Sequence, residues 1–149
     1  MRRRDDQATE RESQAEVEQV YRELDTRPIE RQCTGLGDCC RFRLTGETPY
    51  LTRGEALVAA RAWRATGRRG LPERPNGECP MLSEQGRCMI YKARPMGCRT
   101  HFCDLAGGPL PRRDVIDWIR RLEAVDVRLG GDGPRQIVPA VEAALKEMD

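Results

Sequence analysis

Apolar residues recur with helical spacing in the first part of the chain. Val17, Val20, Tyr21 and Leu24 fall at i, i+3, i+4 and i+7, so they share one face of a helix. Ser13 precedes this stripe with capping-box spacing to Glu16, which predicts that the helix begins near Ser13. Residues 1–12 are charged and carry no apolar stripe. We therefore expect a mobile charged arm over 1–12 and a single domain over 13–149.

Three more helices are predicted by the same spacing. The first begins after a capping box, Thr52 and Glu55, and should stop at Gly67; its apolar face is Ala56, Ala59, Ala60 and Trp63. Two C-terminal helices are expected within 111–149, because Gly130 and Gly131 separate two further stripes. The members of these stripes are Val115, Trp118, Ile119, Leu122 and Val125, and then Val138, Val141, Ala144 and Leu145.

Between the predicted helices, residues 81–95 show the pattern of strands and turns rather than helical spacing. Met81–Leu82 and Cys88–Tyr91 read as two short strands joined by a tight turn, and a helical turn should begin at Pro95. This hairpin would bring Cys79 and Cys88 to the same end. The predicted fold is therefore a small α+β domain with a short β-hairpin, cysteine-rich loops and about four flanking helices.

Composition indicates that the core is thin. Apolar residues are 38% and aromatic residues 5% of the 149 residues, so a bound metal would supplement the packing as a staple. The net charge of +2 gives weak support for a nucleic-acid partner. An arginine run, comprising Arg61, Arg64, Arg68, Arg69 and Arg74, lacks interleaved aromatic residues, which favours a solvated helix face over an anion-binding patch.

No apolar run is long enough for a secretory signal or a membrane span, which predicts a cytoplasmic protein without a membrane partner. Thiols stay reduced in that compartment, where clustered cysteines bind metal or react more often than they form structural disulfides. The chain has seven cysteines, an odd number that disulfides alone cannot consume.

The cysteines are spaced C-x5-C-C-x38-C-x8-C-x9-C-x4-C, and all seven are candidate metal ligands: Cys33, Cys39, Cys40, Cys79, Cys88, Cys98 and Cys103. Thiolates favour zinc, copper(I) and iron-sulfur clusters. The spacing matches neither a zinc ribbon nor a bacterial ferredoxin, so both an iron-sulfur cluster and zinc remain open. The first four ligands expected are Cys79, Cys88, Cys98 and one of the adjacent pair Cys39 and Cys40.

Three further side chains lie within the cysteine segment. His101, the only histidine, is a candidate metal ligand or proton-transfer group. Arg94 precedes Cys98 and Arg99 follows it directly, so the two arginines flank the same turn. They either pair with carboxylates and carbonyls or stabilise thiolate charge around a metal.

These residues resemble a known family. The cysteines from Cys39 to Cys103, with the core C-x-I-Y-x-x-R-P-x-x-C-R over Cys88–Arg99, are similar to the bacterial YkgJ-type cysteine-cluster proteins, which are described as zinc- or iron-chelating domains. The resemblance covers about residues 33–103 and implies metal binding. The family usually begins C-x2-C-x2-C-C, and Leu36 replaces the second of these cysteines here. A related cluster occurs in flagellin lysine methyltransferases, so the resemblance leaves an enzymatic role open.

Three functions follow as hypotheses. The first is a cytosolic metalloprotein whose cysteines hold an iron-sulfur cluster or zinc, with a redox role. The second is a structural zinc module whose terminal helices bind another protein. The third is a redox or methyl-transfer enzyme that acts at the cluster, although the chain has no glycine-rich strand-to-helix motif for a nucleotide or methyl-donor cofactor.

Overall fold

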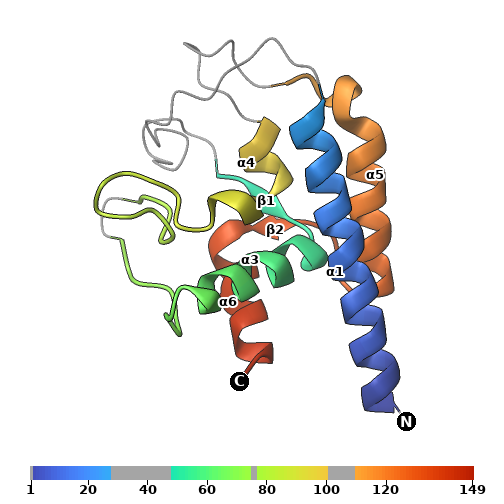
Figure 1. Ribbon diagram of the computed structural model, residues 1–149, viewed down its shortest axis with the longest axis horizontal. Helices are drawn as coiled ribbons and strands as arrows, with labels where there is room; N and C mark the ends of the chain where they lie inside the picture. Colours follow the sequence, from blue (N-terminus) through green and yellow to red (C-terminus); the bar gives the residue numbers. More distant parts are fainter. Residues whose placement is uncertain (1, 28–47, 75–76, 101–109) are drawn as a thin grey trace.

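The computed structural model describes residues 2–27, 48–74, 77–100 and 110–149 (Figure 1). Within these ranges the fold is a small α+β domain, as predicted. The predicted ligands Cys33, Cys39, Cys40 and Cys103, together with His101, lie outside the described residues. The described elements are α1 (Arg2–Thr26), β1 (Tyr50–Leu51), α3 (Arg53–Ala65), η2 (Tyr91–Ala93), α4 (Met96–Thr100), α5 (Arg112–Arg128), β2 (Arg135–Gln136) and α6 (Ile137–Glu147).

Helix α1 begins eleven positions earlier than its apolar stripe predicted, at Arg2 rather than Ser13. Residues 2–12, expected to be an arm outside the domain, are therefore the N-terminal part of α1. Their arginine, glutamine, alanine and glutamate residues are good helix formers that need no buried stripe. Arg61 of α3 also contacts this part of α1 through an ion pair with Glu10 (3.6 Å), and it donates a hydrogen bond to Gln14 in the next turn. Ser13 does not cap the helix but is buried within it.

Helix α3 is the centre of the fold, and α1, α5 and α6 all pack against it (Figure 1). It begins at the predicted capping box, where the Glu55 carboxylate accepts a hydrogen bond from the Thr52 amide (3.3 Å). It ends before Gly67, whose φ of +89° suits glycine. Its small residues let neighbouring helices approach closely: a Cβ at Gly54 would lie 2.7 Å from Val125 of α5 and 3.0 Å from Val17 of α1.

Two apolar clusters lie on either side of α3. One contains Trp63 with residues of α6 and of the segment from Cys79 to Ile90, and the other contains Val58 with the apolar faces of α1 and α5. Both C-terminal helices were predicted, and Gly130, with φ of +73°, ends α5. Most buried members of the two clusters therefore come from the four long helices.

The described sheet joins distant parts of the chain. β1 pairs antiparallel with β2 in the register Tyr50 to Gln136 and Leu51 to Arg135, and the Ile137 amide donates to the Pro49 carbonyl (3.0 Å). This pairing fixes α6 against α3 and was not predicted from the sequence. The hairpin expected over residues 81–91 contains a single bridge, between Leu82 and Cys88, and its second strand gives way to the 3-10 turn η2.

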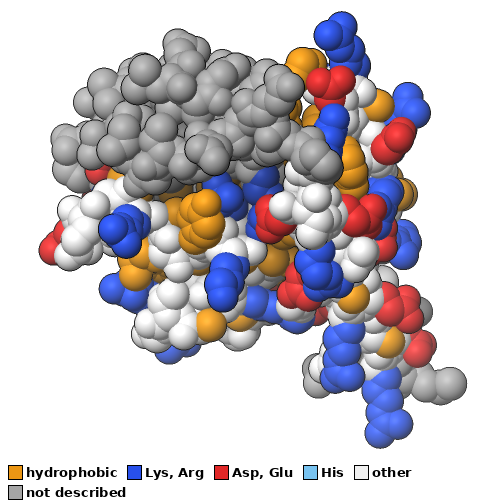
Figure 2. Space-filling view, turned by 45° about the horizontal axis from the view of Figure 1, so that its top comes forward, with side chains coloured by type: hydrophobic (Ala, Val, Ile, Leu, Met, Phe, Trp, Pro, Cys, Tyr) orange, Lys and Arg blue, Asp and Glu red, His pale blue; other side chains and the backbone are white. Residues whose placement is uncertain are grey.

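The arginine run is engaged within the chain. Arg64 and Arg69 bind the Asp149 carboxylate at 2.9 and 3.5 Å, and Arg68 stacks over the Trp63 ring. Basic and acidic side chains are intermixed over the described part of the face in Figure 2. These contacts favour the helix-face interpretation. In the described part of the chain, no helix combines the length and apolar character needed to cross a membrane.

Candidate metal centre

Three of the seven predicted ligands lie in the described residues, on two neighbouring pieces of chain. Cys79 and Cys88 belong to the bridged turn over residues 79–90, and Cys98 belongs to α4. Cys79 is buried, whereas Cys88 and Cys98 are half-buried. No three His, Cys, Asp or Glu side chains of the described ranges gather closely enough to hold a metal ion.

The bridged turn brings Cys79 and Cys88 to a common neighbour. The Cys79 carbonyl accepts a hydrogen bond from the Leu82 amide (3.0 Å), and Leu82 forms the bridge with Cys88. The turn between them closes through a hydrogen bond from Ser83 to the Arg87 carbonyl (2.7 Å), and Gly86 adopts φ of +77°. Both cysteines, nine positions apart in sequence, thus lie next to Leu82.

Helix α4 carries Cys98 and begins after Pro95, also as predicted. The amides of Cys98 and Arg99 donate to the Pro95 carbonyl at 3.0 and 3.1 Å, which closes the first turn. Gly97 lies against β1, where a Cβ would come within 3.3 Å of the Pro49 ring. The backbone on either side of Cys98 is therefore fixed by local bonds and by contact with the sheet.

A buried carboxylate anchors the start of α4. Oε2 of Glu55 accepts hydrogen bonds from the Met96 amide (2.7 Å) and from the Tyr21 hydroxyl (3.1 Å). Its other oxygen accepts from the amide and the hydroxyl of Thr52 at 3.3 and 3.0 Å. One side chain thus joins α1, α3 and α4. The capping-box pattern identified Glu55 as a helix-start residue, but it gave no signal for the contact with α4.

Arg99 makes the second attachment of α4. Its side chain is 4% exposed and binds both carboxylate oxygens of Asp25, at 2.6 and 2.7 Å. It also donates to the carbonyls of Lys92 (2.6 Å) and Arg94 (2.7 Å) and stacks over the Tyr21 ring. Arg94 stacks over the exposed Tyr91 ring. These contacts match the first of the two predicted roles, pairing with carboxylates and carbonyls.

The environment of this network is strongly desolvated. Burial raises the pKa of Glu55, although its four hydrogen bonds oppose the change. Burial, followed by the nearby Glu55 charge, raises the pKa of Tyr21 well above its usual range. Glu55 accepts a hydrogen bond from the Met96 amide and Arg99 lies over the Tyr21 ring, so both buried groups contact residues within two positions of Cys98. The network therefore surrounds the base of the segment that presents Cys98.

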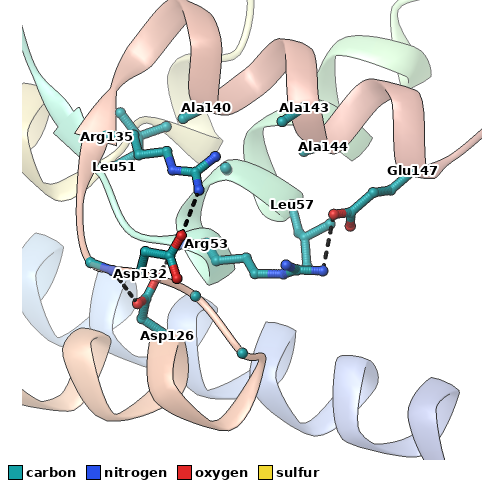
Figure 3. A pocket seen from close by; sticks show the side chains of 14 residues that line it. Leu51, Arg53, Leu57, Asp126, Asp132, Arg135, Ala140, Ala143, Ala144 and Glu147 are labelled. Atoms are coloured by element: carbon teal, nitrogen blue, oxygen red, sulfur yellow. Dashed lines mark hydrogen bonds and ion pairs between the residues drawn. The ribbon is translucent and has the colours of Figure 1, made fainter.

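A separate cavity of about 130 Å³ is bounded by the start of α3, by the loop that follows α5, and by α6 (Figure 3). Its charged side chains are paired across it: Arg53 with Glu147 at 2.9 Å and Arg135 with Asp132 at 3.0 Å. The buried Asp126 accepts hydrogen bonds from the amides of Arg53 (2.7 Å) and Gly133 (2.9 Å). These residues stabilise a helix start and a loop.

The chemistry of the cysteine segment fits a metal that prefers sulfur. Thiolate sulfur selects zinc and iron-sulfur clusters over magnesium or calcium. Of the predicted sulfur ligands, the described residues include Cys79, Cys88 and Cys98, which do not gather into a group of three. They supply no histidine, because His101 lies outside the described ranges.

Comparison with known proteins agrees with this chemistry. The sequence model of the CxxCxxCC family, described as a putative zinc- or iron-chelating domain, matches residues 32–117, which is more than half of the 149-residue chain. The match extends past the predicted 33–103 core into α5. No curated protein and no solved structure matches the chain. The chain therefore belongs to the CxxCxxCC family, the YkgJ-type cysteine-cluster proteins identified from its sequence.

Proposed function

We propose that this chain is a metal-binding protein whose cysteines hold an iron-sulfur cluster or zinc. The observation that carries the proposal is the cysteine pattern within the family match, because that family is one of zinc- or iron-chelating domains. The described structure adds support, since buried contacts hold the backbone on either side of Cys98.

The ligand set in this proposal combines the described cysteines with those elsewhere in the chain. Because no three candidate side chains gather within the described ranges, a four-ligand site would take at least two ligands from outside them. Cys33, Cys39, Cys40, Cys103 and His101 are the candidates there.

Between the two metals, an iron-sulfur cluster is our first choice. Seven thiols exceed the four that one tetrahedral zinc requires, and the adjacent pair Cys39 and Cys40 suits a centre with several metal ions. Such a cluster would allow a redox role. We further propose a cytoplasmic location, because reduced thiols are required in either case.

A structural zinc module that binds a partner through its terminal helices is the second candidate. A specific observation separates the two. Most buried members of the two apolar clusters belong to α1, α3, α5 and α6, so most of the helical packing does not involve the cysteine segment. We therefore expect chelation to leave most of the helical circular-dichroism signal in place, whereas a zinc-dependent fold would lose it.

The direct test is to purify the full chain without oxygen and to measure its visible spectrum and its iron, sulfide and zinc content. A brown protein with stoichiometric iron and sulfide would support the cluster, and redox titration would then follow. A colourless protein that contains zinc would show that the cysteines bind zinc rather than an iron-sulfur cluster. Absence of both metals would refute the proposed function.

Replacement of Cys98 by serine tests one ligand. Cys98→Ser should reduce the metal content of the purified protein, because serine lacks the soft sulfur donor. Met96→Leu is the matched control, since it removes a sulfur atom from the same short helix while conserving volume. Metal content should be unchanged in the control; equal content in Cys98→Ser would remove Cys98 from the ligand set.

A further inference from the structure

Helix α4 is too short to hold its position alone. It contains five residues, and isolated helices of that length are unstable because nucleation costs more than a few hydrogen bonds return. The position of Cys98 must therefore be set by contacts from outside α4. The structure shows two strong ones, at Met96 and at Arg99, which flank Cys98 on either side.

The contact at Met96 connects α4 to α3, the central helix of the fold. Glu55 is 3% exposed and belongs to the first turn of α3, the helix against which α1, α5 and α6 pack. Its carboxylate receives the Met96 amide at 2.7 Å. The same carboxyl group also accepts hydrogen bonds from Tyr21 and Thr52, so the first turn of α4 is held in a network that includes α1 and the start of α3.

The contact at Arg99 fixes the other side. The guanidinium binds the carbonyls of Lys92 and Arg94, so it holds the turn that leads into α4. It also binds Asp25 near the end of α1. The planar fork of arginine makes these bonds in several directions at once, which the single ammonium of lysine cannot do.

We propose that Glu55 and Arg99 are positioning residues that hold Cys98 ready for the metal. This inference rests on the proposed function, because it requires Cys98 to be a ligand. Residues that orient a metal ligand without touching the metal commonly change affinity 10- to 100-fold when replaced. Glu55 lies outside the cysteine motif, and Arg99 is the last residue of its C-x-I-Y-x-x-R-P-x-x-C-R core.

The test is titration of the full chain with Co²⁺ after removal of bound metal under reducing conditions. Co²⁺ binds cysteine thiolates whether their usual metal is zinc or iron. Its thiolate charge-transfer absorption reports the number of sulfur ligands. We expect Glu55→Gln and Arg99→Lys to raise the Kd for Co²⁺ by roughly 10- to 100-fold. We also expect weaker charge-transfer absorption in both variants.

Asp126→Asn is the matched control. Asp126 is as buried as Glu55 and accepts two backbone hydrogen bonds, but its partners are Arg53 and Gly133 rather than residues of α4. It should lower the melting temperature without changing the Kd for Co²⁺. An equal loss of affinity in Asp126→Asn and Glu55→Gln would overturn the inference, since general loosening would then explain both.

A double-mutant cycle tests whether Glu55 changes the affinity for Co²⁺ through Cys98. If Glu55 acts through Cys98, Glu55→Gln should cause no further loss of affinity in a Cys98→Ser background. Full additivity of the two losses would overturn the inference. Wild-type affinity in both Glu55→Gln and Arg99→Lys would also overturn it, while leaving the proposed function intact. Only a wild-type chain that binds no metal would refute both.

Tyr21→Phe keeps the test decisive if Glu55→Gln does not fold. It removes one hydrogen bond to the same carboxylate oxygen and keeps the ring under Arg99. One such bond corresponds to a change in Kd of between about 2- and 10-fold. A folded Tyr21→Phe protein with unchanged Kd and unchanged absorption would count against the positioning role.

Discussion

Gly54 lies where α1 and α5 pack against the first turn of α3, and its replacement by alanine tests how closely these helices meet. An added Cβ would lie 2.7 Å from Cγ1 of Val125 and 3.0 Å from Cγ2 of Val17. Both valines are fully buried in helices, where β-branched side chains have essentially one favourable rotamer. Neither methyl group can rotate away, so the helices themselves would have to separate.

Two effects of opposite sign decide the magnitude. Alanine is favoured over glycine in a helix by at most about 1 kcal/mol. Overpacking of a well-packed interior costs about 1–3 kcal/mol. We therefore expect Gly54→Ala to lower the free energy of unfolding by about 1–2 kcal/mol. For a chain of this length, that corresponds to a fall in Tm of roughly 2–8 °C.

The measurement is urea unfolding and thermal melting of Gly54→Ala beside Gly70→Ala. A Cβ at Gly70 would have no neighbour within 4 Å, and its φ lies outside the left-handed region. Gly70→Ala should leave stability unchanged or raise it by up to about 1 kcal/mol. A Gly54→Ala protein as stable as the wild type would show that the helices have room to accommodate the methyl group, and the packing argument would be wrong.

Two further predictions concern charge. Because burial raises the pKa of Glu55, the folded protein retains a proton at pH values where the unfolded chain has released it. The free energy of unfolding should therefore fall as pH rises above the ordinary glutamate pKa. Urea midpoints measured from about pH 4 to 8 should show a smaller fall in Glu55→Gln than in the wild type. Identical pH profiles of the two proteins would contradict the raised pKa. Arg121 binds Glu16 and Glu23 at 2.8 Å on a partly exposed surface, so Arg121→Met should cost no more than about 1 kcal/mol and the loss should shrink in high salt. A larger loss that does not depend on salt would mean that packing of the arginine stem dominates.

Part of the metal site could be predicted from the sequence, and part of it is visible only in the structure. The spacing of the cysteines, the turn that brings Cys79 near Cys88 and the helical turn after Pro95 could all be predicted, because each depends on neighbours a few positions away. Glu55 was found only as a capping residue. Its bonds to Tyr21 and Met96 join residues 34 and 41 positions apart, and no local pattern reports such distances.

The sequence by itself determined the four long helices, where α3 begins and ends, and the family of the cysteine cluster. These features follow from side-chain periodicity, capping and spacing, which act over one or two turns of chain. Only the tertiary structure decided that β1 pairs with β2 and that Asp25 of α1 binds Arg99 across 74 positions. These contacts form because packing around α3 brings distant segments together, and the closure of such long loops leaves no periodic signature in the sequence.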